Sequence, residues 1–269
     1  MPELFRHQHR FLGRLAVRKV SRPTDGGAAS AAGGGVGTGQ RATIAAPFDV
    51  LLVTHAWHDE RLERCPALAA DGRCSLHAED KPLVCALAPL DALAPDASQH
   101  AVLAARSREA AFWGAACIRA GEPDGFVPLV RRLTLVDPTA RRLLAQRRAV
   151  LALEKQHWGA GVFRLLEPEL FGKPEALAKI PPAGYMSLSI APVLVVLAAV
   201  SDACRARCRE YLDAQLALAR RLGAPQVVRG HAALRDAFAR PLDRYVAGHA
   251  PDGRIAAATE AWLGLEQAA

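Results

Sequence analysis

The sequence predicts a mainly helical α+β protein, in which a small cysteine-rich loop region with short strands precedes a C-terminal helical bundle. Alanine and leucine are abundant, and aromatic residues make up only 6% of the 269 residues, a composition that favours helices. Hydrophobic residues make up 51% of the chain, enough for a globular core. Three of the six cysteines lie within 21 residues, in a stretch with too many turn residues to form one regular element.

The first 54 residues are expected to contain one amphipathic segment, one linker and one strand. Residues 1–20 form a short amphipathic segment with apolar positions between basic ones. Residues 21–40 are low in complexity and rich in glycine and alanine, which predicts a flexible linker or a long loop. Residues 42–54 carry the apolar pattern of a strand, which Pro47 is expected to break.

The chain after the cysteine-rich region is expected to be helical, except for one further strand. A helical pattern covers residues 97–117, and residues 126–136 suit a second strand. Asp137 followed by Pro138 predicts a helix start, because an aspartate caps the first turn and a proline fits its first position. That helix is expected to run to about His157. Further helices are expected at 160–171, 174–180, 188–222, 229–247 and 254–267, the long one ended by Gly223 and Pro225.

These elements group into three expected domains. Residues 1–40 make an N-terminal segment with its linker, residues 41–136 a cysteine-cluster domain, and residues 137–269 a helical region. The net charge of +7 admits an acidic partner, but the arginines are scattered among alanines on expected helix surfaces. We do not expect a nucleic-acid partner, since no aromatic residues are interleaved with the basic ones to stack on bases. Binding to a protein partner, which the sequence does not identify, is left as an open alternative.

The sequence also predicts a cytoplasmic protein with no membrane span. The N-terminus has no apolar run that precedes a cleavage site, so we expect no secretory signal. Residues 184–201 are uncharged and form a weak candidate for a span, at the lower limit of length. A buried core helix explains them better, because an interior helix is also apolar all round. In a cytoplasmic protein, clustered cysteines indicate metal ligands rather than disulfides.

Four cysteines are the candidate metal ligands: Cys65, Cys74, Cys85 and Cys117. Thiolates that loops bring together from different directions can hold tetrahedral zinc or a [4Fe–4S] cluster, and the spacing here does not choose between the two. The alternative is that some of these cysteines are ordinary buried thiols, since a free cysteine packs as a small hydrophobe. The two interpretations are evenly balanced for Cys117.

The remaining candidates have weaker patterns. Cys204 and Cys208 are four residues apart and share one helix face, where they could be ligands, a redox pair or core residues, with the core interpretation favoured. His55 and His58 precede the first loop cysteine and could supply nitrogen ligands, although two ordinary loop histidines are the favoured interpretation. His77 stands close to Cys74 and is a stronger candidate for a role beside a metal.

The cysteine-rich region resembles the second half of the YkgJ-type cysteine-cluster domain, a domain described as zinc- or iron-chelating and similar to one in flagellin lysine N-methylases. The matching segments are CPAL at 65–68, GRCSLH at 72–77 and KPLVCALAP at 81–89. A further cysteine often follows in the family, at a place that Cys117 could fill. The resemblance implies a metal-binding function for these cysteines.

The chain also departs from the family pattern. The family opens with a dense upstream cysteine cluster, whereas residues 1–64 contain no cysteine. His77 replaces the usual tyrosine, and Lys81 and Ala86 replace arginines. The loss of the upstream cluster leaves two interpretations open: a single four-cysteine site, or a metal site that has decayed.

The predicted function is therefore metal binding, by zinc or an iron–sulfur cluster, with a structural or redox-support role. One alternative is a methylase-like or redox enzyme that uses the cluster. The other is an interaction protein whose metal site has decayed. No catalytic residues emerge, because the chain has neither a G-x-S-x-G nor an H-E-x-x-H motif.

Overall fold

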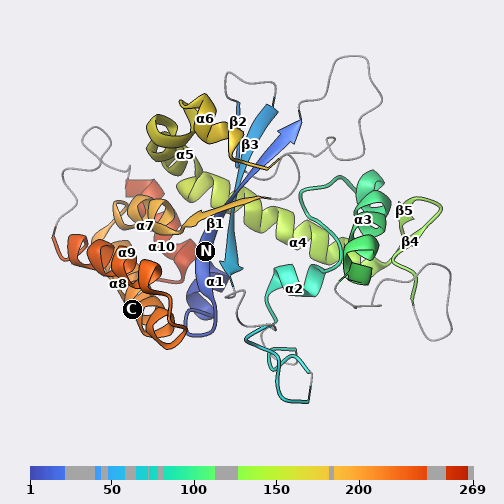
Figure 1. Ribbon diagram of the computed structural model, residues 1–269, viewed down its shortest axis with the longest axis horizontal. Coiled ribbons are helices and arrows are strands. Elements are labelled where there is room, and N and C mark those ends of the chain that lie inside the picture. The colour runs from blue at the N-terminus through green and yellow to red at the C-terminus, as the bar shows by residue number, and fades with distance from the viewer. Residues whose placement is uncertain are drawn as a thin grey trace. The chain divides into compact units, whose positions relative to one another are not determined.

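The computed structural model describes residues 1–21, 40–43, 48–57, 65–71, 73–77, 81–112, 127–181, 185–240 and 253–265. Helices dominate this part of the chain and a small sheet accompanies them, which confirms the predicted mainly helical α+β class (Figure 1). The expected linker at 21–40 falls almost entirely outside the described residues.

One four-stranded sheet has the order β2-β3-β1-β6. The expected strand at 42–54 corresponds to β2, Gln40–Thr43, and β3, Phe48–Trp57, with Pro47 outside the described residues. The amphipathic segment at 1–20 divides into the short helix α1, Pro2–Arg6, and the strand β1, Leu12–Ser21. The edge strand β6, Met186–Ser189, pairs antiparallel with β1, so that Arg14 lies opposite Ser189 and Ala16 opposite Ser187.

The chain divides by its internal contacts into two compact units, and both are built from separate stretches of sequence. Unit 1 comprises Met1–Arg18, Leu52–Ser75 and Glu154–Ala269. Unit 2 comprises Lys19–Leu51 and Leu76–Leu153. The predicted domain boundaries at 40 and 136 stay a prediction.

Unit 1 has a core in which helices pack on β1. Leu15 and Val17 are fully buried on one face of this strand, and Gly13 shares that face. A Cβ added at Gly13 would lie 2.0 Å from the hydroxyl oxygen of Tyr211, so the helix that carries Tyr211 approaches the strand at the one position without a side chain. Besides α1, the described α-helices of this unit are α5, Ala160–Leu166, α6, Pro174–Ala178, α7, Ala191–Ala198, α8, Asp202–Arg221, α9, Pro225–Ala237, and α10, Gly253–Leu263.

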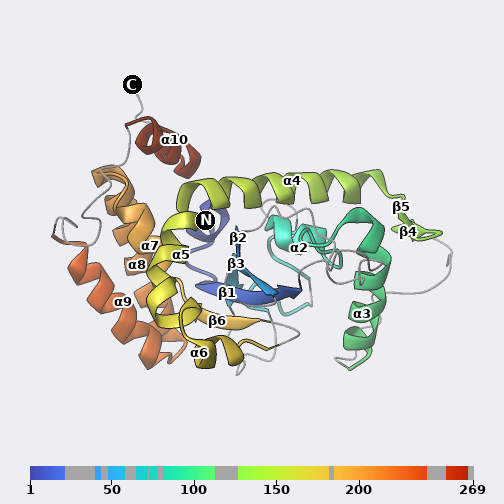
Figure 2. The same cartoon turned by 90° about the horizontal axis from the view of Figure 1, so that it is seen from above.

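The predicted long helix at 188–222 is wrong in one respect, because the structure divides it into β6, α7 and α8. The break between α7 and α8 falls at Ser201, where the backbone is extended. The hydroxyl of Ser201 accepts a hydrogen bond from the amide of Cys204 at 3.1 Å. Ser201 is therefore the N-cap of α8. The predicted end is correct, since α8 stops before Gly223, which has a φ of +63°. In Figures 1 and 2, α8 and α9 lie side by side.

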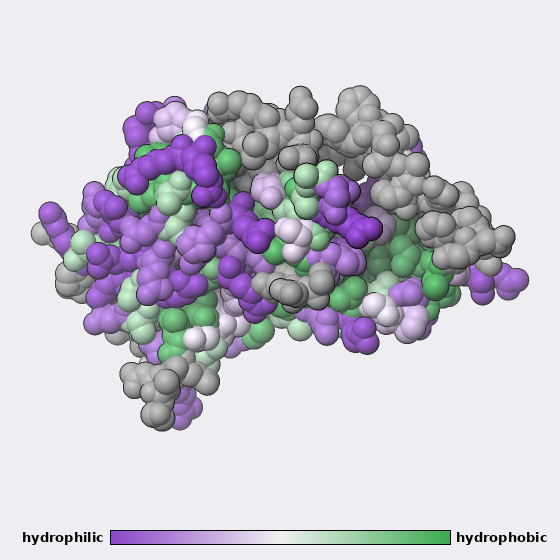
Figure 3. All heavy atoms as spheres, turned by 90° about the horizontal axis from the view of Figure 1, so that it is seen from below, coloured by the Kyte–Doolittle hydropathy of each residue, from purple (hydrophilic) through white to green (hydrophobic). Residues whose placement is uncertain are grey.

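The apolar stretch at 184–201 belongs to the edge strand and the core helix. In α7, Val193, Leu194 and Leu197 are fully buried, which agrees with the favoured core interpretation. Among the residues described, no helix is both long enough and apolar enough to cross a membrane. On the face drawn in Figure 3, hydrophilic side chains predominate and hydrophobic ones gather between them in smaller groups.

Unit 2 contains α2, Leu83–Leu87, α3, Gln99–Phe112, and nearly all of α4, Pro138–Glu154. Asp137 caps α4 as predicted, because its carboxylate accepts a hydrogen bond from the amide of Ala140 at 2.5 Å. The expected single strand at 126–136 is wrong, because the chain reverses there. The strands β4, Val130–Arg131, and β5, Thr134–Leu135, form a small hairpin beside α3 (Figures 1 and 2).

The helix that was expected to end at about His157 does not end there. After α4 the chain continues through a π-helical turn, Lys155–Gly159, directly into α5. A second π-helical turn, Glu167–Phe171, precedes α6. Trp158 within the first of these turns is buried to 1% exposure, so tertiary packing holds the wider turn in place.

Candidate cysteine metal site

The first two loop cysteines lie on the arms of one short turn in unit 1. The amide of Leu68 donates to the carbonyl of Cys65 at 3.0 Å, and Leu68 forms an isolated antiparallel bridge with Cys74. The amide of Ala69 donates to the carbonyl of Arg73 at 2.8 Å. These backbone bonds bring Cys65 and Cys74 into the same small loop.

Ser75 and Arg10 tie this loop to the turn that precedes β1. The amide and the hydroxyl of Ser75 donate to the carbonyl of Ala67 at 2.8 Å and 3.0 Å. The guanidinium of Arg10 then donates to the Ser75 hydroxyl oxygen at 3.0 Å. A cation from a distant part of the sequence therefore lies beside the residue that follows Cys74.

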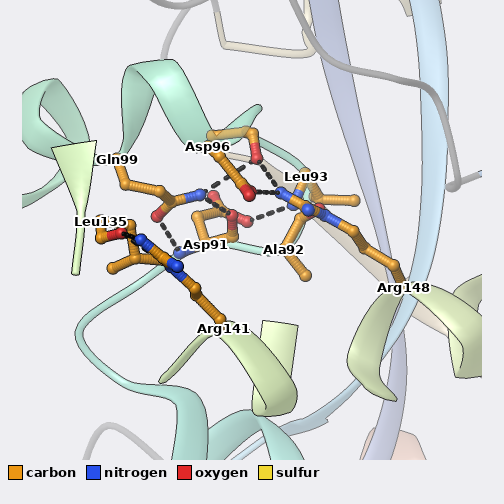
Figure 4. A network of polar contacts seen from close by, with 9 residues as sticks. Asp91, Ala92, Leu93, Asp96, Gln99, Leu135, Arg141 and Arg148 are labelled. Carbon is orange, nitrogen blue, oxygen red and sulfur yellow. Dashed lines mark hydrogen bonds and ion pairs between the residues drawn. The ribbon is translucent and has the colours of Figure 1, made fainter. Parts of the chain in front are cut away.

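The third loop cysteine belongs to unit 2, where Cys85 lies on α2 and is exposed. A network of polar contacts fixes the segment that follows α2 (Figure 4). Gln99, which is fully buried, accepts from the amide of Asp91 at 3.1 Å and donates to the carbonyls of Asp91 and Ala94 at 2.7 Å and 3.0 Å. Arg148 of α4 donates to the carbonyl of Ala94 at 2.8 Å and pairs with Asp96 at 2.7 Å.

The five cysteines within the described residues differ in burial. Cys65 and Cys85 are exposed and Cys74 is half-buried, whereas Cys204 and Cys208 on α8 are fully buried. Burial raises the pKa of both α8 thiols, because a thiolate loses its hydration there. These two thiols are protonated core groups rather than ready metal donors, in agreement with the core interpretation.

The rest of the predicted ligand set lies partly outside the described residues, which include neither Cys117 nor His58. His77 is described and exposed. Within the described ranges, no three histidine, cysteine, aspartate or glutamate side chains gather in a way that could hold a metal ion.

His55 lies on β3 in a different setting from the cysteine loop. Its Nε2 atom is 3.5 Å from the hydroxyl oxygen of Ser187, and its ring makes an edge contact with Tyr185 at 5.1 Å between centroids. Burial lowers the pKa of His55, and this outweighs a backbone hydrogen bond at Ala56 that raises it; the nearby Arg14 also lowers it. The side chain is therefore a neutral imidazole on the sheet.

Two other histidines of unit 1 are buried in ways that the sequence did not indicate. The Nδ1 atom of His157 lies 2.9 Å from the hydroxyl oxygen of Thr259, and its ring stacks on Trp262 at 4.5 Å. His231 on α9 is 4% exposed. Burial lowers the pKa of both, to about 4 for His231. No local pattern could have revealed them, since the partners of His157 are more than a hundred residues away in sequence.

Comparisons with protein families, with curated proteins and with solved structures give no match to this chain.

Proposed function

We propose that the chain binds a metal centre, zinc or a [4Fe–4S] cluster, through the thiolates of Cys65, Cys74, Cys85 and Cys117. The centre would have a structural or redox-support role. We further propose a cytoplasmic location, because a reducing compartment keeps thiols available as ligands.

The surface position of the loop cysteines carries this proposal. Cysteine is among the residue types most often buried, and an exposed thiol is open to oxidation. Cys65 and Cys85 are nevertheless exposed, while the two cysteines of the long helix α8 are buried. Accessible thiols suit ligands that must converge on an ion from several directions.

Arg10 adds electrostatic support. Four thiolates bound to a zinc ion or to an oxidised [4Fe–4S] cluster leave the centre negatively charged, and a nearby cation stabilises that charge. The Arg10 guanidinium reaches the residue next to Cys74 through its hydrogen bond to Ser75. When bound, the metal would supply cross-linking of the loops or electron storage, while the chain supplies the donors and the compensating charge.

Cysteine substitutions test the proposal. We expect Cys65→Ser, Cys74→Ser and Cys85→Ser each to lose most of the metal that the purified chain carries, measured as metal per chain after anaerobic purification. Cys204→Ala is the matched control, because its thiol is buried and protonated, and it should retain the metal. Equal metal contents in all four variants would contradict the ligand assignment.

One observation favours a second candidate function, an interaction protein whose metal site has decayed. The ranges that the structure describes contain no grouped set of three ligands. This alternative predicts a folded chain that binds no metal and keeps its stability when the loop cysteines are replaced by serine.

A further inference from the structure

The β4–β5 hairpin of unit 2 has an unusual turn. Val130 pairs with Leu135 and Arg131 with Thr134, so only two residues connect the strands. Those residues, Arg132 and Leu133, have φ values of +47° and +66°. Two-residue hairpins of this kind favour asparagine and glycine, which adopt positive φ with little strain. A backbone under strain at an exposed turn is more often retained where its side chains are used.

The hairpin also exposes apolar side chains. Val127 at its base is 73% exposed and Leu133 at its tip is 63% exposed, the two highest values among the large hydrophobic residues described. Leu133 therefore combines a strained backbone with a side chain that contributes little to the core. Contact with an apolar phase would stabilise such a side chain.

The chain segment that carries the hairpin is rich in arginine. Residues 127–153 are described without a gap and contain six arginines, with Asp137 as the only acidic residue. The carboxylate of Asp137 is engaged as the cap of α4. Of the six arginines, four are exposed: Arg131, Arg132, Arg141 and Arg142.

Arg141 connects the hairpin to α4. Its Nε atom donates to the carbonyl of Leu135 at 2.8 Å, and a terminal nitrogen donates to the same oxygen. These hydrogen bonds hold β5 against the start of α4, so the strands that carry the turn at Arg132 and Leu133 are fixed in place.

We propose that the hairpin at 127–137 docks on an anionic phospholipid surface, with Leu133 entering the acyl boundary and the exposed Arg132 beside it binding lipid phosphates. Charge complementarity supports this occupant, because basic side chains near an anionic membrane gain binding energy from its surface potential. A nucleic acid would offer phosphates but no apolar phase for Leu133, and the hairpin has no aromatic side chain to stack on a base.

The test is co-sedimentation of the full chain with vesicles of phosphatidylcholine, with or without phosphatidylserine. We expect binding only when phosphatidylserine is present, and weaker binding as salt is added. Arg132→Gln should weaken the binding about fivefold. Leu133→Asn should weaken it about tenfold. Asparagine tolerates positive φ, so this variant should melt at no lower temperature than the wild type.

Arg164→Gln is the matched control, because it removes one exposed arginine from α5 and should bind almost as well as the wild type. Equal binding to both kinds of vesicle, or wild-type binding by Leu133→Asn, would overturn the proposal. Binding to single-stranded RNA that Arg132→Gln weakens and Leu133→Asn leaves intact would assign the hairpin to nucleic acid instead.

Discussion

At the residue scale, Gly13 marks a close approach in unit 1 between the sheet and a helix. An added Cβ would lie 2.0 Å from the hydroxyl oxygen of Tyr211 and 3.3 Å from the ring carbon that bears it. Tyr211 is fully buried, so the ring has little freedom to move away. The glycine is therefore required by packing.

We expect Gly13→Ala to lower the free energy of unfolding by about 3 kcal/mol, because overpacking a dense core forces side chains from their preferred positions. Tyr211→Phe in the same chain should restore most of that loss, since it removes the oxygen that would clash. Urea denaturation of both single variants and the double variant measures the effect. A double variant no more stable than Gly13→Ala would show that the clash with Tyr211 is not the cause.

The buried His231 makes the stability of the folded chain depend on pH. Burial lowers its pKa from 6.5 to about 4, so the unfolded chain binds a proton more tightly than the folded chain does. Its contribution to stability is therefore complete above about pH 6.5 and is lost as the pH falls toward about 4, to a total of about 3 kcal/mol.

Replacement of His231 by glutamine should flatten this dependence. Urea denaturation at about pH 7.5 and about pH 4.5 should show a stability difference about 2.5 kcal/mol smaller in His231→Gln than in the wild type. The comparison between the two chains removes the contributions of the other histidines. An unchanged difference would mean that His231 titrates alike in the folded and unfolded chain.

At the element scale, the boundary between α7 and α8 depends on Ser201. Its hydroxyl satisfies the amide of Cys204, one of the donors that a helix start leaves without a partner. Ser201→Ala should lower the free energy of unfolding by about 1 kcal/mol. Ser201→Asp, which keeps a capping oxygen, should stay close to the wild type in thermal unfolding. If both variants melt alike, the cap contributes nothing to stability.

Element boundaries with a chemical signal could be predicted from the sequence. Asp137 with Pro138 marked the start of α4, and Gly223 marked the end of α8. Ser201 carries a similar cap signal, but it lies inside a long apolar and helix-forming stretch that hides it. The hairpin turn at Arg132 and Leu133 could not be predicted, because neither residue is typical of a positive φ.

At the scale of the whole molecule, composition predicted the mainly helical class, but not the contacts that link distant segments. The contacts of Glu154 are an example of such links between distant segments. Its buried carboxylate accepts a hydrogen bond from Thr54 at 2.9 Å and lies 2.5 Å from the α-amino group of Met1. Three segments of unit 1 meet at this carboxylate, and none of them shares a local pattern with the others.

For the candidate cysteine site too, some features could be predicted from the sequence and others depend on tertiary contacts. The sequence predicted one turn-rich region around Cys65 and Cys74, and the structure places the two residues on one loop. The role of their thiols as metal ligands stays a prediction. The exposure of Cys65, the partial burial of Cys74 and the contribution of Arg10 depend on tertiary packing, which no spacing of cysteines encodes.

The most direct test of the central claim is elemental analysis of the wild-type chain purified without oxygen, together with an assay for acid-labile sulfide and a visible absorption spectrum. The metal-centre account predicts either one zinc per chain in a colourless protein, or iron with sulfide in a brown one. A folded chain that carries neither metal would contradict it.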